Sequence, residues 1–136
     1  MAIREVIFRG KRADNGEWIE GSLLGIDWCD KPSTYSIAPN TPVSVFYSVI
    51  PETVGQYTGL TDKNGVRTFE GDIVSLVKHD SLIYKVVYVP CRYELVNSKG
   101  VNCFVLDIYK SENIEVIGNI HDNPELLGGE NNGINR

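Results

Sequence analysis

TVGQYTGLTDKNGVRTFEGDIV, residues Thr53–Val74, is the stretch that decides the fold. It contains four glycines and one Asn-Gly pair, Asn64-Gly65. Glycine adopts the positive φ angles that tight turns require, so this stretch predicts turns and short extended segments instead of one long element. Apolar residues recur along it and are expected to anchor those segments in a core: Val54, Leu60, Val66, Phe69 and Ile73.

Downstream of this stretch, short strand-like segments follow one another at close spacing. They are rich in β-branched and aromatic residues and are separated by turn residues, which is typical of a small barrel or sandwich. Leu82–Val89 is apolar on both faces except at Lys85, which predicts a central strand buried on both sides. The predicted strands are Asp72–Lys78, Leu82–Val89, Tyr93–Asn97, Val101–Leu106 and Ile114–Ile120.

A helical turn is predicted near the C-terminus. Asn123 is a capping residue, Pro124 suits the first helical position, and Glu125 favours the positive end of the helix dipole. Gly128-Gly129 ends the turn.

Upstream, Glu5–Lys11 and Glu17–Ile26 predict a hairpin. Asn15-Gly16 lies between them and suits a type I′ turn, because both residues tolerate positive φ. Asp27–Pro42 holds three prolines and predicts a long loop or irregular edge, with a short strand at Thr34–Ile37. Val43–Ile50 again predicts a strand.

These signals predict a mainly β chain. We expect an N-terminal β-hairpin region with a Pro-rich loop, residues 1–50, packed on a small SH3-like barrel, residues 51–127. The short helical turn closes the barrel region, and residues 128–136 are expected to form a flexible tail.

Composition and charge narrow the function. The 136 residues carry a net charge of −5 and a pI near 5.0, which disfavours broad binding to phosphate backbones. Cys29, Cys91 and Cys103 are odd in number and widely spaced, so neither a disulfide framework nor a zinc site is expected. No signal peptide or membrane span is apparent, and we expect a cytoplasmic protein with no cofactor.

Glu70-Gly71-Asp72 is the most chemistry-like cluster. Two carboxylates that flank a glycine suit a hard cation or acid–base work, but the same residues also suit the start of a strand, which we favour. Asp62-Lys63-Asn64-Gly65 lacks the alternating acidic residues that calcium needs and predicts a plain turn.

Two further candidates are weaker. His121-Asp122 and His79-Asp80 place a histidine beside a carboxylate, but neighbours on a strand point to opposite faces, so catalysis is not expected. A tyrosine-rich set with nearby cations suits stacking on single-stranded nucleic acid, although ordinary half-buried cover is the favoured interpretation. That set is Tyr84, Tyr88, Tyr93, Tyr109, Lys85, Arg92 and Lys110.

Three stretches together resemble the YopX-like family: IFRGKRADNGEWIEGSLL, SVIPETVGQYTGLTDKNGVRTFEGDIV and IEVIGNIHDNPELL. The resemblance implies a phage or prophage protein without an assigned activity or catalytic residue. His121 departs from the tyrosine often seen there. The polar members of these motifs are expected to form one patch if the middle and final stretches meet: Gln56, Tyr57, Asp62, Glu70, Asp72, Asn119 and His121.

Three functions follow as hypotheses. The leading one is a non-enzymatic module that binds a host or phage protein or assembles with copies of itself. The second is a nucleic-acid-binding accessory factor that uses Lys85 and Arg92. The third is a metal-assisted hydrolase that uses Glu70, Asp72 and His121.

Overall fold

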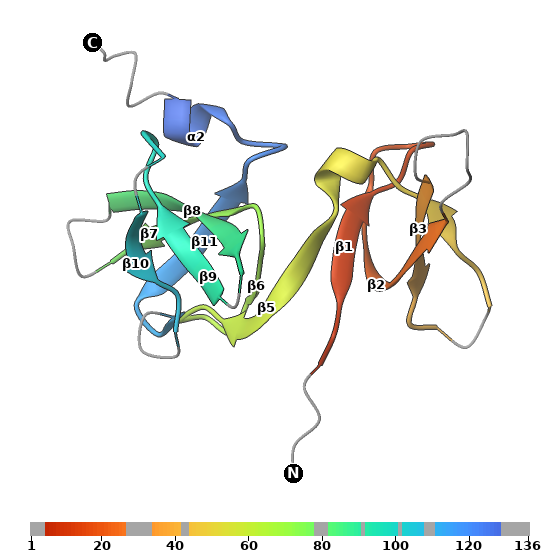
Figure 1. The fold of residues 1–136 in the computed structure, drawn as a ribbon, viewed down its shortest axis with the longest axis horizontal. Coiled ribbons are helices and arrows are strands. Elements are labelled where there is room, and N and C mark those ends of the chain that lie inside the picture. The colour runs from red at the N-terminus through yellow and green to blue at the C-terminus, as the bar shows by residue number, and fades with distance from the viewer. Residues whose placement is uncertain are drawn as a thin grey trace. The chain divides into compact units, whose positions relative to one another are not determined.

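The protein is mainly β, as predicted, and its strands form two antiparallel sheets (Figure 1). The structure is a computed structural model that describes residues 5–26, 34–41, 44–77, 82–90, 92–100, 102–107 and 111–128. Two short helical turns, η1 (Pro51–Thr53) and α2 (Glu125–Gly128), accompany the sheets. Within the described ranges, no helix is both long and apolar enough to cross a membrane.

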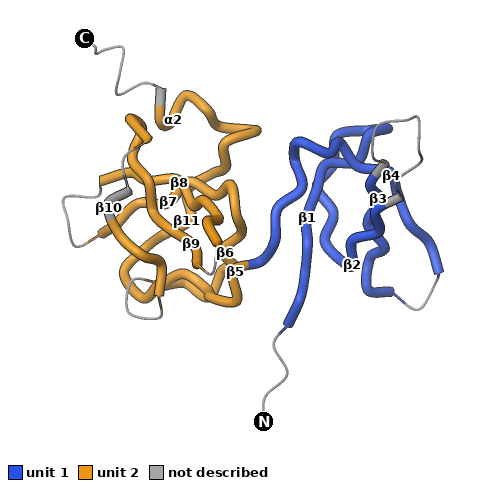
Figure 2. The backbone as a smooth tube through the Cα atoms, in the orientation of Figure 1, with its two compact units in different colours: residues 1–57 blue, residues 58–136 orange. Residues whose placement is uncertain are grey.

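The chain divides into two compact units, residues 1–57 and 58–136 (Figure 2). Strand β5 (Gly55–Thr61) begins in the first unit and ends in the second. The first sheet has the strand order β4-β3-β2-β1-β5-β6, so its last members pass into the second unit. The second sheet, β10-β9-β8-β7-β11, belongs to the second unit alone.

The N-terminal hairpin is confirmed, but its predicted turn type is wrong. β1 (Phe8–Lys11) pairs antiparallel with β2 (Trp18–Ile26). A two-residue Asn15-Gly16 turn would close with a bond from the Glu17 N–H to the Asp14 carbonyl. Instead, the Glu17 N–H donates to the Asn15 side chain and the Gly16 N–H donates to the Arg12 carbonyl, both at 2.9 Å.

The Pro-rich stretch contains a longer strand than predicted. β3 (Thr34–Pro39) pairs with β2 over its whole length and ends at a proline, which is tolerated at a strand terminus. The predicted strand Val43–Ile50 shrinks to β4 (Tyr47–Ser48), which pairs with β3. Residues 27–33 and 42–43 lie outside the described residues.

The segment after β4 hydrogen-bonds in two directions. The Val49 N–H donates to the Tyr35 carbonyl (3.0 Å), while the Ile50 N–H donates to the Lys11 carbonyl (2.9 Å). Residues 48–50 therefore join β3 to the β1–β2 hairpin, and Val49 is buried with Ile37. A Cβ on Gly10 would lie 3.2 Å from the Cβ of Val49, so a side chain at this position would require Val49 to shift by a few tenths of an ångström.

In the second unit, all five predicted strands are present: β8 has the predicted bounds, β9 is shifted by one residue, and the other three are shorter than predicted. The core cluster of this unit includes the fully buried side chains of Leu76, Leu95 and Ile114, together with the buried Tyr84. Residues 78–81, 91, 101 and 108–110 lie outside the described residues, and so does the predicted His79-Asp80 pair. The strands are β6 (Arg67–Phe69), β7 (Asp72–Leu76), β8 (Leu82–Val89), β9 (Arg92–Val96), β10 (Asn102–Val105) and β11 (Ile114–Asn119).

The strand buried on both sides is β7, and the prediction that assigned this role to β8 is wrong. β8 is central in its sheet, but its burial alternates, and Leu82 and Tyr88 are 51% and 55% exposed. Every residue of β7 is buried, including Asp72 and Ser75. The composition of β8 shows that the strand is hydrophobic, but whether a strand is buried depends on which elements cover each of its faces.

The predicted C-terminal helical turn is present, whereas the predicted barrel is not confirmed. The Leu126 and Leu127 N–H groups donate to the carbonyls of Asn123 and Pro124, which confirms the predicted helical turn. Among the described residues the sheets do not close into a barrel, so the SH3-like arrangement has no confirmation. Residues 129–136, most of the predicted tail, lie outside the described residues.

Candidate functional site

Asp62 ties the β5–β6 loop to β11. The residue is 5% exposed, and its carboxylate accepts hydrogen bonds from three backbone N–H groups. Oδ1 receives those of Asn64 (2.8 Å) and Val66 (2.9 Å), and Oδ2 receives that of Val116 (2.9 Å). The predicted turn is confirmed, and its carboxylate also secures a strand far along the chain.

Asp72 and Gly71 form the start of β7, as the favoured interpretation predicted. Gly71 has a φ of 93°, which is open mainly to glycine. Asp72 is 1% exposed, and its Oδ2 accepts a 2.7 Å bond from the Phe69 N–H. Glu70 is half-buried in the same corner.

The polar corner after β11 is organised by Asn119. Its Oδ1 accepts the N–H groups of His121 and Asp122, each at 2.9 Å, and its amide donates to the Asp122 carboxylate at 3.3 Å. A side chain on Gly118 would collide with Asn123, whose Oδ1 would lie 2.6 Å from the added Cβ. These residues shape the chain reversal that leads into α2.

The structure brings together some of the seven predicted patch residues. Asp72 lies opposite Asn119 in the β7–β11 pairing, and the Gly71 carbonyl accepts the Ile120 N–H at 2.9 Å. The middle and final motifs therefore meet at this corner, which also carries Glu70 and His121. Asp62 is anchored further along β11, at Val116.

Gln56 and Tyr57 belong to the first unit, at the start of β5. Gln56 pairs with Phe8, and the buried Tyr57 donates its N–H to the Ile7 carbonyl at 2.8 Å. The described residues include no group of three or more His, Cys, Asp or Glu side chains placed to hold a metal ion. The hydrolase hypothesis, which required Glu70, Asp72 and His121 to converge, therefore gains no geometric support.

The predicted nucleic-acid surface is divided between two faces of the second sheet. Tyr84 and Tyr88 share one face of β8, and Tyr93, opposite Tyr88, lies on that face as well. Lys85 and Arg92 project from the other face. Tyr84 is buried, and Tyr109 and Lys110 lie outside the described residues.

Arg92 forms an ion pair with Glu94. Its Nη2 lies 2.7 Å from Oε2 of Glu94, a side chain that is only 7% exposed. The pair neutralises the charge of Arg92, so the electrostatic attraction of phosphates to this face is weakened.

Sequence reasoning missed a cation–aromatic cluster on the β1–β2 hairpin. Arg9 and Lys11 lie over the ring of Trp18, with 4.9 and 5.5 Å from Cζ and Nζ to its centroid. Strand alternation and the pairing of Lys11 with Trp18 place all three on one face. We call Arg9, Lys11 and Trp18 the hairpin cluster. The alternation in RGK was a usable signal, but the facing tryptophan appears only once the register is known.

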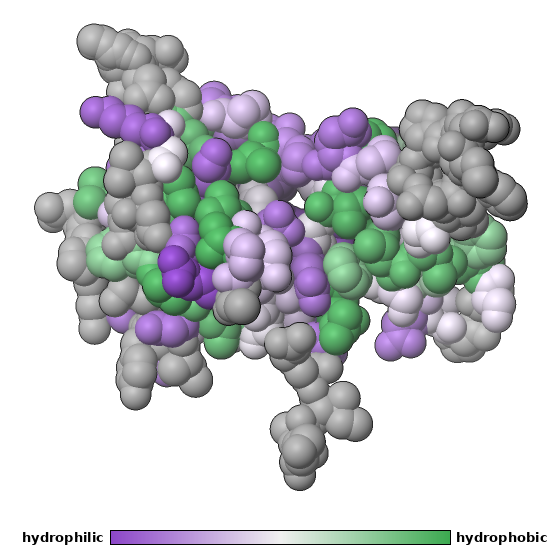
Figure 3. Space-filling view, in the orientation of Figure 1, coloured by the Kyte–Doolittle hydropathy of each residue, from purple (hydrophilic) through white to green (hydrophobic). Residues whose placement is uncertain are grey.

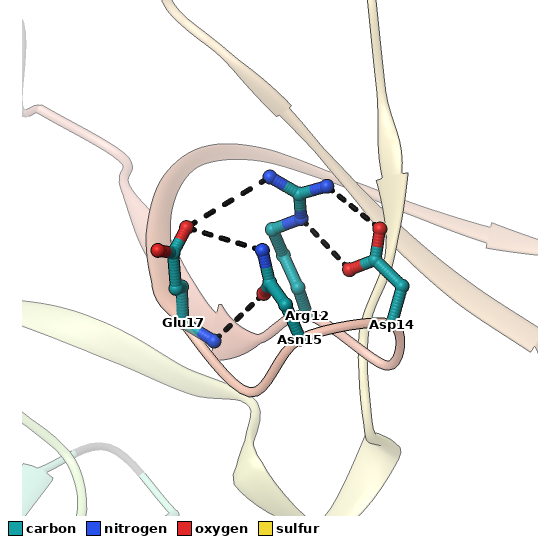
Figure 4. Close-up of polar contacts among 4 residues, drawn as sticks. All are labelled: Arg12, Asp14, Asn15 and Glu17. Atoms are coloured by element: carbon teal, nitrogen blue, oxygen red, sulfur yellow. Dashed lines mark hydrogen bonds and ion pairs between the residues drawn. The ribbon is translucent and has the colours of Figure 1, made fainter.

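A second polar cluster fills the hairpin loop (Figure 4). Arg12 holds Asp14 through two bonds, Nε at 3.0 Å and Nη2 at 2.7 Å, and its guanidinium stacks 4.0 Å from the ring centroid of Tyr47. Asn15 donates to Glu17 at 3.2 Å. The Arg12 hydrogen bond holds the pKa of Asp14 below its ordinary value, and the same bond raises the pKa of Arg12.

The crystal structure of protein EF1440 from Enterococcus faecalis is similar, with a TM-score of 0.56 and 23% sequence identity, over 92% of this chain and 99% of that chain. At that identity the likeness shows the fold alone. No curated protein matches the sequence. The family model described as YopX protein matches residues 7–128, and the chain therefore belongs to the YopX family.

Proposed function

We propose that this YopX family protein is a non-enzymatic protein-interaction module, encoded by a phage or prophage and active in the cytoplasm of the bacterial host. The hairpin cluster carries the proposal. It gathers a tryptophan and an arginine on one face of a hairpin, and these residue types dominate the binding energy of protein interfaces.

The polar corners of the second unit support a structural role over a catalytic one. Both carboxylate oxygens of Asp62, Oδ2 of Asp72 and Oδ1 of Asn119 accept hydrogen bonds from backbone N–H groups. Groups used in this way stabilise turns and strand starts. We further propose that this unit is an SH3-like barrel that acts as a scaffold for the binding surface.

Exposed apolar side chains on the first unit add to the binding surface. Leu24, on the same strand as Trp18, is 43% exposed, and Phe46 is 63% exposed. Green, hydrophobic side chains gather over β1, β2 and β3 on the visible face of this unit (Figure 3). Such a surface suits a host or phage protein or a second copy of this chain.

Affinity capture with matched variants tests the proposal. The wild-type chain, Trp18→Ala and Lys99→Glu, an exposed cation of the second unit, serve as baits in lysates of the bacterial host with and without phage infection. Light scattering of each purified bait measures self-association.

We expect wild type and Lys99→Glu to retain the same partner or the same oligomer, and Trp18→Ala to lose it. Circular dichroism verifies that Trp18→Ala is folded. If a folded Trp18→Ala retains every interaction of the wild type, the hairpin cluster is not the binding surface.

A further inference from the structure

We propose that Asn64-Gly65 is a site of spontaneous deamidation, at which the chain modifies itself without an enzyme and weakens its own fold. An asparagine followed by glycine is prone to this reaction, because glycine has no side chain to hinder attack by its backbone nitrogen. The described part of the chain holds two such pairs, Asn15-Gly16 and Asn64-Gly65, and both are exposed in loops. Their side-chain contacts differ, and this difference selects the site.

The side chain of Asn15 is held in place, whereas that of Asn64 is not. Oδ1 of Asn15 accepts the Glu17 N–H at 2.9 Å and Nδ2 donates to Oε1 of Glu17 at 3.2 Å, so both bonds must break before the amide can turn toward Gly16 (Figure 4). Asn64 donates its backbone N–H to Oδ1 of Asp62 at 2.8 Å, and its side-chain amide has no hydrogen-bond partner among the described residues. The Asn64 amide is therefore free to approach the following nitrogen.

The backbones of the two loops do not distinguish the pairs. The Gly16 N–H donates to the Arg12 carbonyl at 2.9 Å, and the Gly65 N–H donates to the Asp62 carbonyl at 3.0 Å. Both glycines have positive φ angles, 76° and 81°. Because the two attacking nitrogens are held alike, the asparagine side chains decide which pair reacts first.

The reaction needs only water. The Gly65 nitrogen loses its proton to solvent hydroxide and forms a bond to Cγ of Asn64. The Cγ–Nδ2 bond breaks, and Nδ2 takes up a proton from water and leaves as ammonia. Water then opens the resulting succinimide ring at one of its two carbonyls. Opening at Cγ gives an ordinary aspartate, whereas opening at the backbone carbonyl gives an isoaspartate, whose main chain is longer by one carbon atom.

The isoaspartate product disturbs the hydrogen bonds of Asp62. Oδ1 of Asp62 accepts the N–H groups of Asn64 and Val66, at 2.8 and 2.9 Å, and these two donors flank Gly65. An extra main-chain carbon between them changes their spacing, so one oxygen can no longer bind both. Because Oδ2 of the same carboxylate binds the Val116 N–H of β11, this loss also loosens the connection of the loop to the second sheet.

Peptide mapping by mass spectrometry, on chains aged in mildly alkaline buffer, measures the conversion of each asparagine. We expect Asn64 to convert about tenfold faster than Asn15, because two hydrogen bonds restrain the Asn15 side chain. The variant Glu17→Ala removes the acceptor of the Asn15 amide, so it should speed conversion of Asn15 and leave the rate at Asn64 unchanged. Asn132-Gly133 lies outside the described residues and is read from a separate peptide.

Conversion of Asn15 as fast as that of Asn64, or no conversion of Asn64, would overturn the site. Melting temperatures test its effect on the fold. Aged wild type should melt below fresh wild type, whereas Asn64→Gln should melt alike before and after ageing, because glutamine would have to form a larger ring. Asn64→Asp carries the new charge on an ordinary main chain and should melt close to fresh wild type.

Conversion at Asn64 without a fall in melting temperature would overturn the effect on the Asp62 hydrogen bonds. An equal fall in aged Asn64→Gln would do the same, because the loss would then arise elsewhere in the chain. An Asn64→Asp variant that melts as low as aged wild type would assign the loss to the added charge and reject the role of the longer main chain.

Discussion

Asp62 shows how a single carboxylate can join distant parts of a β structure. Its two oxygens bind backbone N–H groups in its own turn and one on β11, 54 positions away. In the sequence, Asp62 belongs to a stretch that loosely resembles an ion-binding loop but predicts a plain turn. The hydrogen bonds decide in favour of structure.

Replacing Asp62 by alanine should destabilise the second unit by about 3 kcal/mol, because buried N–H groups lose a charged acceptor. Asp62→Asn should cost less, since it keeps one acceptor oxygen. Urea unfolding measures both, with the exposed Glu112→Ala as the control, expected within about 0.5 kcal/mol of the wild type. Equal stability of Asp62→Ala and Glu112→Ala would contradict this role.

Gly21 is expected to be intolerant of any side chain. An added Cβ would overlap the Ala38 carbonyl oxygen and lie 2.8 Å from its carbon, both backbone atoms of the paired strand. Gly21→Ala should therefore cost about 2–3 kcal/mol by overpacking. Gly65→Ala, where the Cβ has open space but φ is +81°, should cost about 1–2 kcal/mol. Thermal unfolding ranks the two, and a smaller cost for Gly21→Ala would refute the close approach.

At the scale of elements, the hairpin loop gives a pH prediction. The pKa of Asp14 is lowered in the folded state, so its stabilising contribution is complete above the ordinary Asp pKa of about 3.9 and disappears as the pH falls through the lowered value. Asp14→Asn should remove this part of the acid destabilisation. The effect is small, because the pair is exposed, and salt should reduce it further.

Melting temperatures of wild type, Asp14→Asn and Glu112→Gln across the acid range provide the measurement. Only Asp14→Asn is expected to flatten the fall in melting temperature with pH. An acid limb as steep in Asp14→Asn as in the wild type would show that the Arg12 contact contributes nothing in solution.

The elements also show which sequence signals were sufficient. Glycine-punctuated turns and β-branched runs predicted the hairpin and the strands of the second unit, and the capping residue Asn123 with Pro124 predicted α2, because these features depend on neighbours in sequence. The prediction of a two-residue turn at Asn15-Gly16 was wrong because Arg12 and Glu17 bind side chains of the loop and favour a longer loop. The burial of β7 depends on the order of the strands in the sheet, and the pairing of Lys11 with Trp18 depends on the strand register. No local sequence pattern contains either.

For the whole molecule, the excess of acidic residues governs behaviour in solution. With a net charge of −5 at pH 7 and a pI near 5.0, the chain should reach its solubility minimum close to pH 5. Turbidity of concentrated samples over a pH series measures this minimum. Lys99→Glu adds negative charge and should move the minimum to lower pH, and a minimum that does not move would contradict the charge argument.

The bonds that residues 48–50 make to Tyr35 and to the β1–β2 hairpin have a consequence for biosynthesis. The first strand is translated roughly 40 residues before the segment that secures it, and contacts of large sequence separation form slowly. A nascent chain that has emerged only as far as residue 46 lacks the residues that make these hydrogen bonds. Acquisition of native structure by the first unit should therefore begin late in its own synthesis, once Ile50 has left the ribosome.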